Sequence, residues 1–400
     1  MKTCSESMLP LHGIDLSSFI DSDISPISPN NLSHIHRLPV ELLQHLFLLI
    51  VNDIPDCPSI FSFGDTTISA NVASPPLLFT HVCRLWRVVA HSTSGVWSRI
   101  HVALPARHEP LNPFLTSLLQ FWLAHSGSHP LTLRIVSTPR RHFFSCGRSQ
   151  PTFTEGDSQM LEMLLAEKER WKTVTIMPRL LARYEGRNFD TPRLSTLKCF
   201  WWDTKKFMAP HLRRLLIIDS YLPDVDVTSI PTCKNLRHLH FRSASVHAIR
   251  CILEYFPHLE SIAVDELLSV SGYGPITTTH PCLESITLPL HSDPHLRGIF
   301  IEFFDGLHLP MLRKLTVVGE PNKPQVDCIV VALGIASCRV EVVDFQADTP
   351  ASEVDLDIVK PLFSAVREIT LRGHWGSACA VVMTYSRLSH NASAHDAIIS

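Results

Sequence analysis

Leu236-Arg237-His238-Leu239-His240-Phe241 has apolar residues at its first, fourth and sixth positions and polar residues between them. The same spacing returns in further copies along the chain, and this repetition decides the fold. The first positions of the copies are Trp171, Leu194, Leu212, Leu236, Leu259, Leu283, Leu312, Val340 and Val366. Adjacent copies start 18 to 29 residues apart, close to the period of about 20 to 29 residues of one class of repeat protein. The sequence therefore predicts a repeated structural unit over most of its length.

Each repeated unit combines a short strand with a helical face. Segments with apolar residues every three or four positions lie between the copies, for example from Val246 to Phe256 and from Val326 to Leu333. One such unit cannot bury its apolar strand and helix alone, so neighbouring units must stack. The pattern resembles leucine-rich repeats without their asparagine ladder. We therefore expect an α/β protein in which residues 105–375 form an irregular leucine-rich-repeat-like strand-helix solenoid.

A small all-α module is expected before the repeats, at residues 35–104. Leu38-Pro39-Val40-Glu41 predicts the start of a helix, because proline suits the first turn and an acidic side chain suits its positive end. The positions that follow, to Ile50, are apolar on nearly all sides, so this helix is either buried or available to a partner. Residues 52–76 predict an unusually long loop, and Leu78 to Val89 predict a second helix.

The flanking segments have weaker patterns. Residues 1–34 are rich in Ser, Asp, Pro and Asn and predict a disordered tail, whereas residues 376–400 lack the repeat and predict a C-terminal cap or tail. A helix that begins at Pro113 and stops at Gly127, and a strand from Leu131 to Val136, are expected after the helical module. The following helix is expected to be capped by Asp157.

Two stretches of the helical module resemble the F-box motif. They are Leu38-Pro39-Val40-Glu41-Leu42-Leu43 and Val82-Cys83-Arg84-Leu85-Trp86, the second followed by Trp97. The usual motif is Leu-Pro-x-Glu-Ile, a helix, then Val-Cys-[Arg/Lys]-x-Trp and a downstream Trp. Ser126-Gly127 and Pro130-Leu131-Thr132-Leu133 extend the likeness to the F-box proteins of mushroom-forming fungi. The resemblance covers roughly residues 37–136.

The resemblance implies a non-catalytic adaptor of a cullin-RING (SCF) ubiquitin ligase. Its F-box would dock on the small S-phase-kinase-associated linker subunit, and through it on the cullin, while the repeats recruit a substrate protein. The residues expected to contact the linker subunit are Leu38, Pro39, Leu42, Leu43, Leu46, Phe47, Val82, Cys83 and Trp86. The loop 52–76 departs from the short connection of most F-boxes, and we expect it to influence docking affinity.

The apolar helix supports a docking role independently of the family. A module this short covers little of Leu42, Leu43, Leu46 and Phe47, and an exposed apolar patch marks a partner site. The alternative is that the first helices of the solenoid bury this patch. A repeat-built interaction scaffold that is unconnected to ubiquitin transfer would then be the function.

A second predicted surface is the concave side of the repeats. In each copy the side chains between the apolar positions point away from the core. The charged and histidine side chains expected there are Lys198, Arg214, His238, His240, Arg242, Asp265, Lys314, Asp344, Glu368 and Arg372. The early repeats are basic, which predicts a substrate segment with an acidic or phosphorylated end over Lys198, Arg214 and Arg242. Solvation of a strand face is the alternative.

Metal binding and catalysis have little support in the sequence. His238 and His240 share one side of a strand, with Asp265 as a neighbour on the next repeat, but two imidazoles without a third ligand are a weak zinc site. No nucleophile elbow, phosphate-binding glycine loop or His-Glu-x-x-His motif is present. We therefore expect no metal, no cofactor and no enzymatic activity.

Composition limits the partners and the compartment. The formal net charge is -3, so no overall field attracts nucleic acid or an anionic membrane. The first 20 residues lack the basic flank and apolar run of a signal peptide. The sequence has no Cys-x-x-Cys pair, and its cysteines lie mostly among apolar neighbours, as in a reducing compartment. A cytoplasmic or nuclear protein with protein partners is the expectation.

Overall fold

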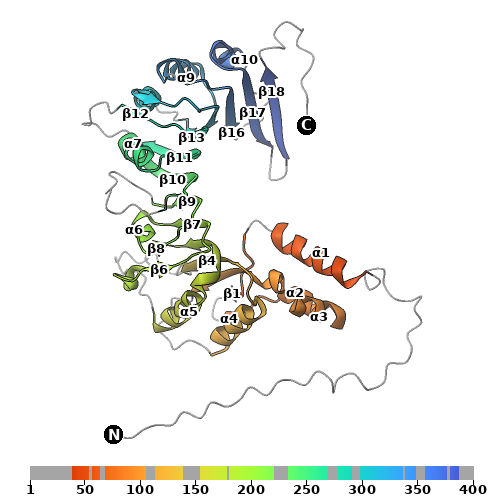
Figure 1. The fold of residues 1–400 in the computed structure, drawn as a ribbon. Coiled ribbons are helices and arrows are strands. Elements are labelled where there is room, and N and C mark those ends of the chain that lie inside the picture. The colour runs from red at the N-terminus through yellow and green to blue at the C-terminus, as the bar shows by residue number, and fades with distance from the viewer. Residues whose placement is uncertain are drawn as a thin grey trace, which may run out of the picture.

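A single large sheet organises the mixed α/β fold of the computed structural model (Figure 1). The structure describes residues 38–53, 56–63, 68–104, 113–137, 154–177, 180–219, 233–268, 277–290, 298–336, 338–347, 356–375 and 379–386. The sheet has 12 strands in the order β3-β4-β5-β7-β9-β10-β11-β13-β15-β16-β17-β18. Strand order therefore follows sequence order, as expected when each unit packs beside the preceding one. The predicted α/β class is confirmed, whereas the predicted N-terminal tail lies outside the described residues.

Neighbouring strands of the large sheet pair parallel from β3 to β17, with one register shift between β4 and β5. The strands of this sheet are β3 (Arg99–Leu104), β4 (Leu131–Ser137), β5 (Trp171–Ile176), β7 (Thr196–Cys199), β9 (Arg214–Ile217), β10 (His238–Ser245), β11 (Ser261–Leu268), β13 (Ser285–Pro289), β15 (Lys314–Val318), β16 (Val342–Ala347), β17 (Glu368–Trp375) and β18 (Cys379–Ser386). Leu215, Leu239 and Ile262 are paired across their strands and all are buried. Such rows of aligned apolar side chains form the core between the sheet and its helices.

Three small strand pairs stand apart from the large sheet. β1 (Phe61–Phe63) and β2 (Ile68–Ala70) are antiparallel and lie within the segment predicted to be a loop at 52–76. The pairs β6 (Phe189–Asp190) with β8 (Phe207–Met208), and β12 (Thr278–Thr279) with β14 (Leu307–His308), are parallel. The segment 52–76 thus carries local structure that its Pro-rich and Ser-rich composition conceals.

The N-terminal helices are α1 (Val40–Asp53), α2 (Leu77–Val82), α3 (Arg84–Ser92) and the 3-10 helix η4 (Ser94–Trp97). Sequence periodicity predicts one helix from Leu78 to Val89, which is wrong because the chain breaks at Cys83. The backbone of Cys83 is extended, with φ -160 and ψ 174, and its Sγ accepts a hydrogen bond from the backbone N–H of Trp86. Cys83 therefore caps α3, and the apolar period runs across the break because both helices face the same core.

Helices and 3-10 turns connect the later strands. They are α4 (Pro113–His125), α5 (Glu155–Ala166), η5 (Lys168–Arg170), η6 (Ala182–Tyr184), α6 (Trp201–Thr204), α7 (Val246–Tyr255), α8 (Gly298–Phe304), α9 (Lys323–Ile335), α10 (Leu356–Val359) and η10 (Lys360–Ser364). The predicted stop of α4 at Gly127 is confirmed, since this glycine has φ +52 and follows the last helical turn. The predicted cap of α5 is wrong, because Thr154 is the N-cap and Asp157 completes its capping box.

The sheet curves, so the molecule has an outer side and a hollow side (Figure 1). Helices α7 and α9 lie on the outer side, whereas α1 faces the hollow from the N-terminal end. At the C-terminal end, β18 pairs antiparallel with β17. Part of the segment predicted to be a cap or tail at 376–400 is therefore an edge strand. No helix of the described part of the chain combines the length and apolar character needed to cross a bilayer.

Candidate binding surfaces

Helix α1 has two apolar faces with different environments. Leu43, Phe47 and Val51, spaced four residues apart, are 0 to 1% exposed and belong to the same continuous core as the sheet. Leu42 and Leu49 lie on the other face and are 56% and 54% exposed. Together with Leu38, which is 36% exposed, they form what we call the outer stripe of α1. An uncovered stripe of this kind on an otherwise packed helix is typical of a partner site.

The residues predicted to contact a linker subunit separate into two groups. Leu38, Pro39, Leu42 and Val82 are exposed and available to a partner. Leu43, Leu46, Phe47, Cys83 and Trp86 are buried or partly buried and instead hold the helices together. The rings of Phe47 and Phe79 stack at 4.2 Å between centroids, and Trp86 meets Phe47 edge-on at 4.9 Å. This aromatic cluster fixes α1 on α2 and α3, and the outer stripe is thereby left facing outward.

The predicted concave-face residues occupy adjacent rows on the sheet. Arg214, His238, Lys314 and Glu368 share one row, and Lys198, His240 and Asp344 share the next. Arg242, Asp265 and Arg372 each lie two residues further along their strands. These positions alternate with buried core residues, as the pattern of β10 illustrates. The predicted alternation is therefore confirmed for β7, β9 and β10, whereas on β16 the predicted hollow-side residue Asp344 is itself buried.

Several of these charges are already paired within the chain. Asp344 is 1% exposed and forms ion pairs of 2.9 Å with both Lys314 and Arg372. His240 Nε2 lies 2.7 Å from Asp265 Oδ1, and His238 Nδ1 lies 2.8 Å from the Ser261 hydroxyl. Asp265 and Asp344 thus already have partners within the chain, and the buried Asp344 stabilises the face more than it offers an acceptor to a ligand.

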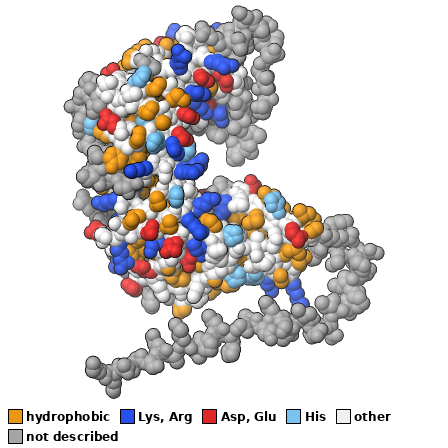
Figure 2. All heavy atoms as spheres, in the orientation of Figure 1, with side chains coloured by type: hydrophobic (Ala, Val, Ile, Leu, Met, Phe, Trp, Pro, Cys, Tyr) orange, Lys and Arg blue, Asp and Glu red, His pale blue; other side chains and the backbone are white. Residues whose placement is uncertain are grey.

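The unpaired positive charge gathers nearer the N-terminal end. Among the described residues, Lys172, Lys198, Arg214 and Arg242 have no ion-pair partner. Figure 2 shows Lys and Arg side chains along the hollow between the N-terminal helices and the rest of the sheet. The basic character predicted for the early repeats therefore corresponds to accessible charge, which a ligand with negative groups would neutralise.

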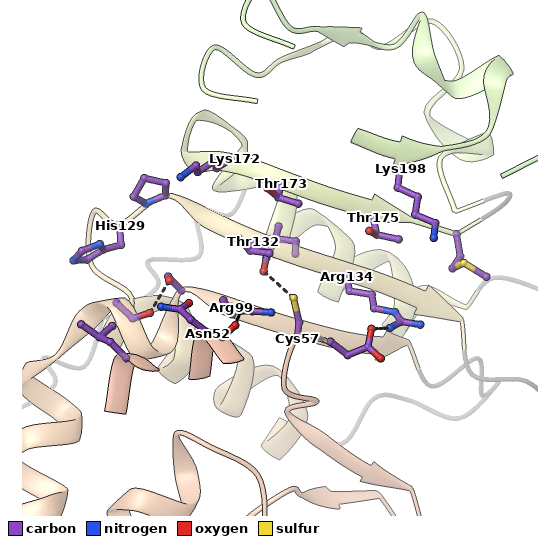
Figure 3. Close-up of a pocket in the computed structure, with 17 residues that line it drawn as sticks. Asn52, Cys57, Arg99, His129, Thr132, Arg134, Lys172, Thr173, Thr175 and Lys198 are labelled. Atoms are coloured by element: carbon purple, nitrogen blue, oxygen red, sulfur yellow. Dashed lines mark hydrogen bonds and ion pairs between the residues drawn. The ribbon is translucent and has the colours of Figure 1, made fainter. Parts of the chain in front are cut away.

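A groove of about 780 Å³ lies where this basic region meets the N-terminal helices (Figure 3). Two arginines that line this groove, Arg99 on β3 and Arg134 on β4, were not predicted from the sequence. The alternation of Leu131, Leu133 and Ile135 would have placed Arg134 on the hollow side. Arg99 precedes the recognisable repeats, and its Nη1 donates a hydrogen bond of 3.0 Å to the Asn52 carbonyl at the end of α1.

Burial and these cations act together on the pKa of nearby imidazoles but oppose each other at the Cys57 thiol. Burial lowers the pKa of His101, and Arg134 lowers it further. Burial also lowers the pKa of His238, and Arg214 adds to this effect. The Cys57 thiol in the groove has a raised pKa, because burial outweighs the opposing influence of Arg99. The imidazoles are thereby biased toward the neutral form, so the lasting positive charge here comes from Arg and Lys.

Acid should destabilise the fold, because burial lowers the pKa of His91, His101, His238 and His280 from the ordinary value of 6.5. Below that value the unfolded chain takes up more protons, so the free energy of unfolding falls as pH falls. We expect a lower urea midpoint at about pH 5.5 than at about pH 7.5.

His91→Phe should reduce this pH dependence. Burial is the largest cause of the lowered pKa of His91, followed by His125 and then Arg87. Its ring stacks on Trp97 with 5.7 Å between centroids, and phenylalanine can keep that contact without taking up a proton. An unchanged difference between the two urea midpoints in this variant would contradict the assignment.

The predicted histidine pair lies on β10. No group of three or more His, Cys, Asp or Glu side chains in the described part of the chain is arranged to hold a metal ion. His238 and His240 instead have separate partners, Ser261 and Asp265. The two histidines on β10 are thus hydrogen bonded to side chains of the neighbouring strand β11.

Comparison with known proteins adds no family assignment. No protein-family model matches the chain, and no curated protein shows a significant match to it. The two surfaces that bear on function are the outer stripe of α1 and the basic groove.

Proposed function

We propose that this chain is a substrate-recognition adaptor of a cullin-RING ubiquitin ligase, present in the cytoplasm or nucleus. Its N-terminal helices would serve as an F-box that docks on the linker subunit. The stacked strand-helix units would act as a leucine-rich-repeat-like solenoid that binds a substrate protein. The proposal unites the F-box-like sequence at 38–43 and 82–86 with the in-line parallel sheet that follows it.

The observation that carries the proposal is the exposed outer stripe of α1. Burying a leucine side chain in an interface contributes about 1.5 to 3 kcal/mol, and Leu42 and Leu49 are both more than half exposed. Exposed Leu78 and Val82, at 42% and 52%, add apolar surface on α2. A partner that covers α1 and α2 would remove this surface from water.

A double variant of α1 tests the docking. Leu42→Asp with Leu49→Asp should weaken binding of the full chain to the purified linker subunit by about 30-fold, since two interface anchors would become charged. Biolayer interferometry gives the Kd. The matched control is Val331→Asp on α9, where the valine is 48% exposed on a different helix, and it should bind like the unmodified chain.

Failure of the unmodified chain to bind would contradict the ligase assignment. A repeat-built interaction scaffold is then the function, an alternative favoured by the continuous core that joins α1 to the sheet. The half-buried Leu46 is left unchanged in this test because its substitution would disturb the packing of α1 itself.

A further inference from the structure

One wall of the groove in Figure 3 includes Asp56 and Cys57, from the segment 56–60 between α1 and β1. The backbone N–H of His101 on β3 donates to the Pro58 carbonyl at 3.0 Å, and the Ile60 N–H donates to the His101 carbonyl at 3.2 Å. The Cys57 thiol reaches the Thr132 carbonyl on β4. The inserted segment is therefore anchored on the sheet edge, and it brings Asp56 to the groove.

Two cations of the groove have a defined spacing. Arg134 on β4 is paired with Thr175 on β5, and Thr175 is paired with Lys198 on β7. The three residues therefore lie in one row across the sheet. Two strand spacings separate β4 from β7, which amounts to about 10 Å. In a polyproline II segment, which has three residues per turn and a rise of about 3.1 Å per residue, side chains three residues apart lie on the same side and about 9 Å apart. A peptide that crosses the strands can therefore present one side chain to each cation.

One of these cations already holds an internal carboxylate. Asp56 forms an ion pair with Arg134, and the two side chains are 74% and 39% exposed. Lys198 has no ion-pair partner among the described residues, and the hydroxyl-bearing Thr175 lies between the two cations (Figure 3). An exposed ion pair contributes little to stability, so Asp56 can be displaced at low cost.

We propose that this groove binds an acidic protein segment with two negatively charged side chains three residues apart. One of them replaces Asp56 on Arg134, and the other pairs with Lys198. This inference rests on the proposed function for one point only, that the segment belongs to a substrate of the ligase. The contact between Asp56 and Arg134 is an intramolecular copy of the interaction that the ligand makes.

The lining favours a protein ligand over nucleic acid. Single-stranded nucleic acids are held by aromatic side chains on which the bases stack, and the described lining contains no Phe, Tyr or Trp. The cation row is also short, since the next position after Lys198 in the row is Leu216 on β9.

Fluorescence anisotropy of the full chain tests the groove with a labelled peptide, fluorescein-Gly-Ser-Glu-Gly-Ser-Glu-Gly-Ser. We expect this peptide to bind at least about tenfold more tightly than its Gln counterpart, and Lys198→Ala or Arg134→Ala to weaken it about tenfold each. Asp56→Asn should tighten binding about threefold, because the internal competitor loses its charge. Lys323→Ala, at an exposed lysine at the start of α9, is the control and should have no effect.

A phosphoserine version of the peptide identifies the source of the negative charge. Tighter binding that still depends on Lys198 supports the same site with a phosphorylated segment as its ligand. Equal affinity for the Glu and Gln peptides overturns the proposal, as does tighter binding of a single-stranded oligonucleotide than of either acidic peptide. The Leu42→Asp, Leu49→Asp variant should keep peptide binding, and Lys198→Ala should keep linker-subunit binding, so failure of one function is distinguishable from failure of the other.

Discussion

Trp97→Ala should lower the free energy of unfolding by about 3 to 5 kcal/mol, the range for large aromatic side chains removed from a core. Trp97 ends η4 and is 0% exposed. Its indole N–H donates a hydrogen bond of 2.7 Å to the Ala90 carbonyl at the end of α3, and its ring meets Trp122 of α4 edge-on at 5.2 Å. The substitution thus removes a contact that joins the N-terminal helices to the first units of the sheet and leaves the Ala90 carbonyl without this donor.

Urea unfolding followed by circular dichroism measures this loss, and Trp202→Ala is its matched control. Trp202 is 56% exposed, so its replacement should change the free energy of unfolding by less than about 0.5 kcal/mol. Stacked units do not always unfold as one, so hydrogen exchange should be measured on the same samples. Faster exchange confined to α3, η4 and α4 is expected in Trp97→Ala. Similar stabilities of the two variants would contradict the role given to Trp97.

Strand positions were the most predictable part of the fold, for a physical reason. Each strand packs in line with its predecessor, so Leu215, Leu239 and Ile262 repeat one environment, and one periodic pattern reports it. The pattern does not extend to β18, which pairs antiparallel with β17 at the edge of the sheet. The break at Cys83 was also hidden, because Val82 and Trp86 continue the apolar spacing on either side of it.

The groove was less predictable than the sheet. Asp56 and Arg134 are 78 residues apart in the sequence, and no local pattern connects them. Their approach depends on how the inserted segment lies along β3, which is fixed by backbone hydrogen bonds at Pro58 and Ile60. Lys198 and Arg214 were predictable because strand alternation alone places them. A site formed by a loop and a strand that are far apart in the sequence can be recognised only in the folded structure.

Arg250→Met should lower the free energy of unfolding by about 2 to 4 kcal/mol, because it removes hydrogen bonds between residues that are far apart in the sequence. Arg250 lies on α7 and is only 6% exposed. Its Nη2 donates to the Glu302 carbonyl at 2.6 Å and also to the Asp305 carbonyl, at the end of α8. The last carbonyls of a helix generally lack an intrahelical donor, and here the guanidinium reaches the C-terminal end of α8 from the neighbouring unit. Methionine keeps much of the volume but removes these donors, and charged hydrogen bonds contribute about 1.5 to 3 kcal/mol each.

The measurement is the urea midpoint together with hydrogen exchange of α8, and Arg339→Met is the control because Arg339 is exposed. Exchange should accelerate in α8 and in the adjoining strand β14, while α4 and α5 keep their protection, since nearest-neighbour coupling limits how far a lost contact is felt in stacked units. Uniform acceleration along the whole sheet would instead mean that the chain unfolds as one cooperative body. Unchanged exchange in α8 would show that its C-terminal carbonyls do not depend on Arg250.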